Sequence, residues 1–310
     1  MPIAMTVAQA RAVLRDGGHD AQGLTPLKGG AWSTVFGFSE AGQDYVVKFH
    51  DRRDDLEKDR FAQRWASPAL RTPRVIEIDE IREGAYAILP RVAGAPIDGL
   101  DEAGMRAVLP SLFAAMDAMR EADLTGTRGF GLWHGDGTAP YTSWRDNLLL
   151  EEPPGERGAQ RKRLAATPIG TAEFDAGLKR IQELQPFCPE ERHLVHNDLL
   201  YNNVFRDEQG IVMLDWGASL FGDFLYDVAL LTVWWPWYAK RWGGIDIQRE
   251  VEAHYAEIGF HVPAFRERLR CYELDIGVSH IAYQAEHEEW DKARWTAART
   301  LELVRAPIDG

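Results

Sequence analysis

Residues 193–205, HLVHNDLLYNNVF, place a cluster of polar side chains between two short apolar pairs. Carboxylate and amide oxygens suit Mg²⁺, a hard cation that takes oxygen ligands and shares its shell with substrate phosphates. A further carboxylate beside such a site can orient a hydroxyl nucleophile and accept its proton during phosphoryl transfer. Asn and Asp are also common turn formers and helix caps, so the cluster alone leaves a structural role open.

The elements that follow decide which of these groups meet. After Val204-Phe205, the turn RDEQG and the run IVMLDWG predict a β-hairpin. Pairing across that turn would bring Asn203 within a residue or two of Asp215, with Asp198 on the loop just before. We therefore predict that Asn203 and Asp215 bind Mg²⁺ and that Asp198 is the catalytic base.

The first 90 residues offer groups that could bind nucleotide phosphates. Lys48 interrupts the apolar strand YVVKF, and a buried ammonium is costly unless an anion meets it. We expect Glu57 of the following helix to pair with Lys48, although an edge strand with Lys48 in water stays open. The turn LKGGAWSTVFGF could cover phosphates at Gly30 and Ser33, or be an ordinary hairpin turn.

The predicted elements change character at Pro90. Before it, WSTVFGF, DYVVKF, RVIEI and AYAIL are strand-like, with the helical stretch DDLEKDRFAQRWA between the second and third. After it, the connector PRVAGAPIDG leads into mostly helical sequence. We predict an α+β fold of two lobes: residues 1–90 form a small antiparallel sheet lobe with one main helix that binds nucleotide. Residues 91–310 form a larger, mainly helical lobe with the catalytic loop and the substrate pocket.

Composition limits the partners and the location of the protein. A formal net charge of −13 over 310 residues argues against nucleic acid, because phosphate binding needs a basic surface. Cys188 and Cys271 form neither a disulfide framework nor a zinc motif. The N-terminus lacks the apolar core of a signal peptide, and the apolar run 228–238 is too short to cross a bilayer. We expect a cytoplasmic protein with no membrane partner.

Several motifs together resemble the aminoglycoside phosphotransferases. The strongest are HNDLLYNN, LDWG and FGDFLYDVA, and EKDRF, RGFG and YTSWRD extend the similarity through most of the chain. The resemblance implies a protein-kinase-like fold and Mg²⁺-dependent transfer of phosphate from ATP or GTP to an aminoglycoside hydroxyl. It favours hygromycin B as the acceptor and antibiotic resistance by inactivation as the outcome. We also expect the protein to be a monomer.

The same resemblance carries roles to individual residues. It makes Asp198 the catalytic base, Asn203 and Asp215 the Mg²⁺ ligands, and Lys48 the phosphate-binding lysine with Glu57 as its partner. It also places the adenine of ATP at the connector from Ile88 to Arg91, where backbone groups would bind it.

An aminoglycoside carries many hydroxyls and ammonium groups, so its pocket needs carboxylates and flat aromatic faces. We predict Asp223, Glu286, Trp235 and Trp237 as acceptor contacts. A packed core position for a tryptophan and a solvated helix face for the charge run EHEEWDK are the structural alternatives.

Two other functions fit part of this pattern. One is a kinase of the same fold for a small metabolite such as choline, homoserine or an amino sugar. The other is a nucleotide-binding protein without catalysis, which the joint presence of Lys48, Asp198, Asn203 and Asp215 disfavours.

Overall fold

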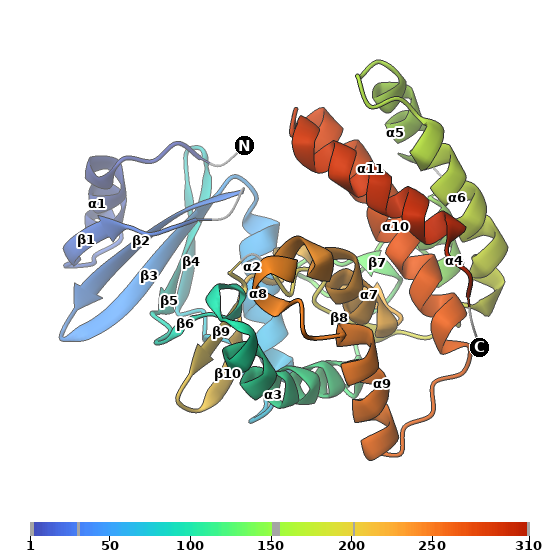
Figure 1. Cartoon of the computed structure of the whole chain (residues 1–310). Coiled ribbons are helices and arrows are strands. Elements are labelled where there is room, and N and C mark those ends of the chain that lie inside the picture. The colour runs from blue at the N-terminus through green and yellow to red at the C-terminus, as the bar shows by residue number, and fades with distance from the viewer. Residues whose placement is uncertain (1–2, 30–31, 151–155, 201, 309–310) are drawn as a thin grey trace.

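The computed structural model describes residues 3–29, 32–150, 156–200 and 202–308, and it places a small sheet beside a larger helical part (Figure 1). Within the described residues, the N-terminal strands pair antiparallel in the order β1-β2-β3-β5-β4. The elements of this part are α1 (Val7–Asp16), β1 (Gln22–Pro26), β2 (Ser33–Glu40), β3 (Gln43–His50), α2 (Arg53–Ala62), β4 (Glu77–Ile81) and β5 (Gly84–Pro90).

The two faces of this sheet pack against different helices. Because side chains alternate along a strand, Val47 and Phe49 of β3 face one way and Lys48 faces the other. Val47 and Phe49 share a core cluster with Leu14 of α1, whereas Leu56 of α2 packs with Ala87 of β5 on the opposite face. Lys48 therefore points to the face that α2 covers.

The rest of the chain is mainly helical. Helix α10 lies at its centre and packs against α6, α7 and α11 (Figure 1). The helices are α3 (Glu102–Arg120), α4 (Trp144–Leu149), α5 (Glu156–Ala165), α6 (Ala172–Leu184), α7 (Leu225–Trp234), α8 (Ala239–Trp242), α9 (Ile247–Glu257), α10 (Phe265–Glu286) and α11 (Trp290–Arg305). The short strands are β6 (Ala95–Pro96), β7 (Gly131–Leu132), β8 (His193–Val195), β9 (Val204–Asp207), β10 (Gly210–Met213) and β11 (Leu220–Gly222).

The structure confirms the predicted α+β architecture with a small antiparallel sheet lobe and a helical lobe. It also confirms the hairpin, since β9 and β10 pair with Val204 opposite Met213. The strand expected over RVIEI begins later, at Glu77, although the amide of Ile76 already bonds the carbonyl of Ile88 at 2.8 Å. In the described part of the chain, no helix is long and apolar enough to span a membrane.

The connector between the two parts follows β5. Strand β5 ends at Pro90, and β6, the next strand, pairs with β9 rather than with the N-terminal sheet. We propose on this basis that residues 1–90 and 91–310 are the two lobes.

Candidate active site

One carboxylate holds the backbone of the predicted catalytic loop in place. Asp227, in the first turn of α7, accepts hydrogen bonds from the amides of His196 at 2.9 Å and Asn197 at 2.8 Å. Burial raises the pKa of Asp227 to about 7, and these two amides oppose that rise. Asp227 thus fixes the backbone immediately before Asp198.

His196 supports the same loop. Its ring is fully buried against Trp216, and its Nε2 donates to the carbonyl of Leu214 at 3.0 Å. Burial lowers the pKa of His196 to about 4, so the ring is neutral near pH 7. A neutral ring with one nitrogen bound to a carbonyl ties the loop to the end of the β9–β10 hairpin.

Two Asn residues give the loop its turns. Asn197 and Asn202 adopt left-handed backbone angles, with φ of 60° and 71°. Asn tolerates this region better than most residues other than Gly. The polar cluster in the sequence is therefore partly a requirement of the loop geometry.

Asp198 and Asn203 meet directly. The Nδ2 of Asn203 donates to Oδ2 of Asp198 at 2.6 Å and to the Asp198 carbonyl at 3.1 Å. Burial raises the pKa of Asp198 to about 7; the charge of Asp215 adds to the rise and the Asn203 hydrogen bond opposes it. A carboxylate with a pKa near 7 is well matched to accepting a proton from a hydroxyl.

Asp215 lies across from this pair. The amide of Leu214 bonds the carbonyl of Asn203 at 2.8 Å, so the hairpin holds the two predicted metal ligands one residue out of direct register. Asp215 has a left-handed φ of 63°, and its Oδ1 accepts from the Lys48 ammonium at 2.9 Å.

Lys48 is buried between two carboxylates. Its Nζ lies 2.9 Å from Asp215 and 3.3 Å from Oδ2 of Asp59 on α2. Burial alone would lower the pKa of Lys48, but the two carboxylates outweigh it and hold the pKa well above its usual value. The ammonium is therefore charged and held at the cleft by both lobes.

The prediction that Glu57 pairs with Lys48 is wrong. Glu57 instead lies 3.0 Å from Arg53 and 3.2 Å from Arg60, and all three side chains are partly exposed. Helical spacing explains the difference, because the buried residues Asp55, Lys58, Asp59 and Ala62 repeat at three to four residues along α2. Position 57 falls on the other side of the helix.

The residues beside Asp59 also hold the segment after Asp215. Asp59 accepts from the amide of Trp216 at 2.7 Å, and the buried Lys58 ammonium donates to the carbonyls of Gly217 at 2.6 Å and Ser219 at 3.0 Å. Burial lowers the pKa of Lys58 to about 8. Our sequence reasoning missed both roles; the spacing of Asp55, Asp59 and Ala62 is consistent with one buried helix face, but it does not show which partners that face meets.

A cavity of about 610 Å³ lies between the lobes at this site. Lys48, Ser33, Arg91, Asn203 and Asp215 are among the residues that line it. Gly30 lies outside the described residues.

The predicted adenine contact at Ile88 needs correction. The side chain of Ile88 is buried with Val47 on the opposite face of the sheet, and its carbonyl accepts from the amide of Ile76. The amide of Arg91 likewise donates to the carbonyl of Asp44 at 2.9 Å. The connector surface that lines the cavity runs from Leu89 to Gly94, so the nucleotide contacts would lie one or more residues later than expected.

Two of the predicted acceptor contacts are structural. Asp223 is fully buried, where it binds the Arg268 guanidinium at 2.8 and 2.9 Å and accepts from the Tyr272 hydroxyl. Trp235 is buried against Trp242, and its Nε1 donates to a backbone carbonyl. Neither side chain is free to touch a substrate, because a buried polar group already has its partners and a buried indole fills the core.

The side chains of the other two predicted acceptor contacts, Trp237 and Glu286, are exposed to solvent. Trp237 is 43% exposed and packs edge-on against Trp295. Glu286 is exposed at the end of α10, with Arg163 at 3.6 Å.

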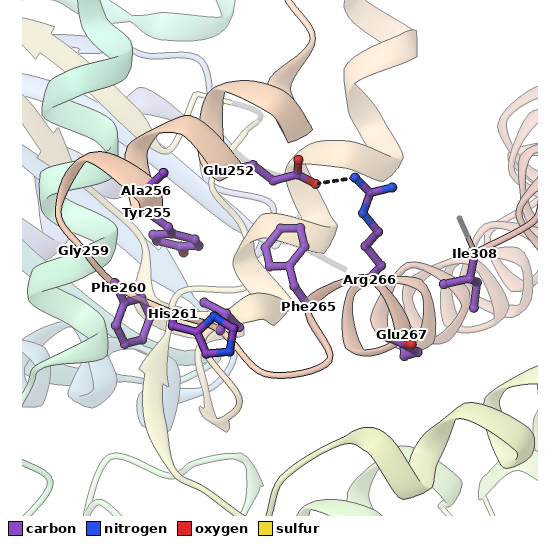
Figure 2. Close-up of a pocket in the computed structure, with 11 residues that line it drawn as sticks. Glu252, Tyr255, Ala256, Gly259, Phe260, His261, Phe265, Arg266, Glu267 and Ile308 are labelled. Atoms are coloured by element: carbon purple, nitrogen blue, oxygen red, sulfur yellow. Dashed lines mark ion pairs between the residues drawn. The ribbon is translucent and has the colours of Figure 1, made fainter. Parts of the chain in front are cut away.

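A second cavity, of about 560 Å³, lies away from this site (Figure 2). It is formed by α9, the start of α10 and the chain near Ile308, with Tyr255, Phe260 and Phe265 among its walls. None of the predicted site residues that the structure describes lines it.

The comparisons with known proteins agree with this geometry. The model of the phosphotransferase enzyme family matches residues 23–267, so the chain belongs to this family, as predicted. The chain is 34% identical to hygromycin-B 4-O-kinase of Escherichia coli over 286 residues, which cover 91% of this chain and 81% of that protein.

Solved structures of phosphotransferases and related kinases share the fold of this chain. A thermostable mutant of aminoglycoside phosphotransferase APH(4)-Ia, in a ternary complex with AMP-PNP and hygromycin B, superposes with a TM-score of 0.83 at 31% identity, covering 95% of this chain and 97% of that chain. A choline/ethanolamine kinase family protein from Mesorhizobium loti has a TM-score of 0.67 at 18% identity, covering 98% and 96%, and shares the fold.

Proposed function

We propose that this protein transfers the γ-phosphoryl group of ATP to a hydroxyl of an aminoglycoside, with hygromycin B as the preferred acceptor. Lys48, Asn203 and Asp215 line one cavity, and Asn203 is hydrogen-bonded to Asp198; this arrangement is the observation that carries the proposal. The identity with hygromycin-B 4-O-kinase and the hygromycin B bound to the similar crystal structure support the choice of acceptor.

Each residue has a distinct part in the proposed reaction. Asp198 orients the acceptor hydroxyl and takes its proton as the bond from the acceptor oxygen to the γ-phosphorus forms and the bond from that phosphorus to the departing ADP breaks. Lys48 offsets negative charge on the phosphates, and Asp59 and Asp215 fix its direction. Asp227 keeps the loop that carries Asp198 in place without touching the substrate.

The donor set of Asn203 and Asp215 fits Mg²⁺. The amide nitrogen of Asn203 is used on Asp198, which leaves its oxygen available to a cation. Asp215 uses Oδ1 for Lys48 and contributes a second carboxylate oxygen. Bound Mg²⁺ would neutralise charge on the phosphates, whose oxygens would complete its coordination shell.

Mass spectrometry tests this proposal. Incubation of the purified protein with ATP, Mg²⁺ and hygromycin B should add one phosphate to the antibiotic, and a panel of other aminoglycosides should react more slowly. Transfer to choline or homoserine with none to hygromycin B would overturn the choice of acceptor. ATP binding without transfer to any acceptor would overturn the proposed activity.

We also propose that the protein is a cytoplasmic monomer that confers resistance by inactivating its acceptor and has no nucleic-acid or membrane partner. The free thiols of Cys188 and Cys271, both buried, support a reducing compartment. Size-exclusion chromatography tests the monomer, and the inhibitory concentration of hygromycin B for cells that express the protein tests resistance.

A further inference from the structure

The loop between β1 and β2 touches the helical lobe at both of its described ends. Lys28 lies 3.5 Å from Oδ1 of Asn202 in the catalytic loop. Trp32 packs against the end of α10, with its ring centroid 6.1 Å from that of Tyr283 and 5.7 Å from that of His287. The loop that borders the cavity between the lobes therefore also reaches the end of α10, where Glu286 is a predicted acceptor contact.

Trp32 is 44% exposed, which is unusual for the largest apolar side chain. Its two partners are one helical turn apart, and their rings lie 4.2 Å from each other. The three rings form a surface with contributions from both lobes, in which Trp32 and His287 are exposed and Tyr283 is partly buried.

The loop that carries Trp32 also contacts the proposed catalytic loop, through Lys28 and Asn202. Burial raises the pKa of the Tyr283 hydroxyl, and the charges of Glu289 and Asp198 raise it further. The carboxylates of Glu286 and Glu288 follow on the same exposed turn. Aromatic faces next to carboxylates match a ligand that has sugar rings and several ammonium groups.

We propose that Trp32, Tyr283 and His287 form an aromatic wall of the acceptor site, and that Trp32 is a specificity-determining residue contributed by the nucleotide lobe. The inference rests on the proposed function, because it names side chains that would bind the proposed acceptor. In this proposal the exposed Trp32 takes the acceptor-binding role that we predicted for Trp235, which is buried.

Equilibrium binding to the whole protein tests the wall. We would measure the dissociation constants of hygromycin B and of AMP-PNP by calorimetry for wild type, Trp32→Ala, Trp32→Phe and Phe187→Ala. Phe187 is the matched control, since it is an exposed aromatic residue, 49% accessible, on the short helix that follows α6.

Trp32→Ala should weaken hygromycin B binding roughly tenfold and leave AMP-PNP binding within about twofold, because the lost contact is a ring face for a cationic sugar. Trp32→Phe should recover most of the affinity, and Phe187→Ala should match wild type. Loss of AMP-PNP affinity alone, or no change in either constant, would overturn the inference. So would a wild-type protein that binds no aminoglycoside.

The two proposals fail differently. Wild type that binds hygromycin B without phosphorylating it would refute the proposed activity, yet a weaker complex for Trp32→Ala would still support the wall. If the wild type phosphorylates hygromycin B and Trp32→Ala does so with the same KM for hygromycin B, the aromatic wall is refuted and the proposed activity stands.

Discussion

The pairing of Lys48 with Asp59 rather than Glu57 gives the sharpest prediction. Replacing Asp59 by Asn keeps the shape of the side chain and removes the charge that lies 3.3 Å from the Lys48 ammonium. At an effective dielectric constant of about 20, Coulomb's law gives that contact roughly 5 kcal/mol. The loss of this Coulomb energy is partly offset, because the variant no longer has the free-energy cost of burying the charged Asp59 carboxylate.

The second carboxylate reduces the loss further. Asp215 stays 2.9 Å from the ammonium, so the lysine is not left without a counterion. We therefore expect Asp59→Asn to lower the free energy of unfolding by about 2 kcal/mol, below the 3–5 kcal/mol typical of a fully broken buried pair. The KM for ATP should rise too, because Lys48 would lose one of the two groups that fix its direction.

Glu57→Gln is the matched control. Its pairs with Arg53 and Arg60 are partly exposed, and such pairs contribute about 0–1 kcal/mol. Urea unfolding of both variants and steady-state kinetics with varied ATP measure the contrast. A Glu57→Gln variant that loses as much stability as Asp59→Asn, or more, would refute the reasoning.

Two further predictions follow from the same site. Since the pKa of Asp198 is near 7, kcat/KM should fall by about tenfold per pH unit below that value as the base is protonated, and more Mg²⁺ should move this limb to lower pH. A flat profile on the acid side would contradict a base role. Lys58→Met should lower kcat and destabilise the fold by about 2 kcal/mol, because two buried carbonyls lose their donor. Arg60→Met, on the exposed side of α2, should change both quantities little; equal effects would argue against the Lys58 contacts.

The arrangement of the predicted catalytic centre could be anticipated from the sequence because its geometry is local. Asp198, Asn203 and Asp215 lie within 18 residues, and a tight hairpin fixes which of them meet. Short sequence separation leaves few alternative arrangements.

Partners far apart in the sequence could not be predicted in the same way. The helix after Lys48 carries acids at 54, 55, 57 and 59, and only its rotation against the sheet selects Asp59. Asp223 looked available until the fold placed Arg268 against it, 45 residues later. The role of Trp32 depends on how the lobes meet, which no local pattern encodes.

The most direct test of the central claim is Asp198→Asn, assayed for phosphate transfer to hygromycin B and for AMP-PNP binding. The account predicts a fall in kcat of about a hundredfold to ten-thousandfold, with nucleotide affinity and thermal stability close to wild type. A folded variant that transfers phosphate at a rate near that of wild type would contradict the assignment of Asp198 as the base.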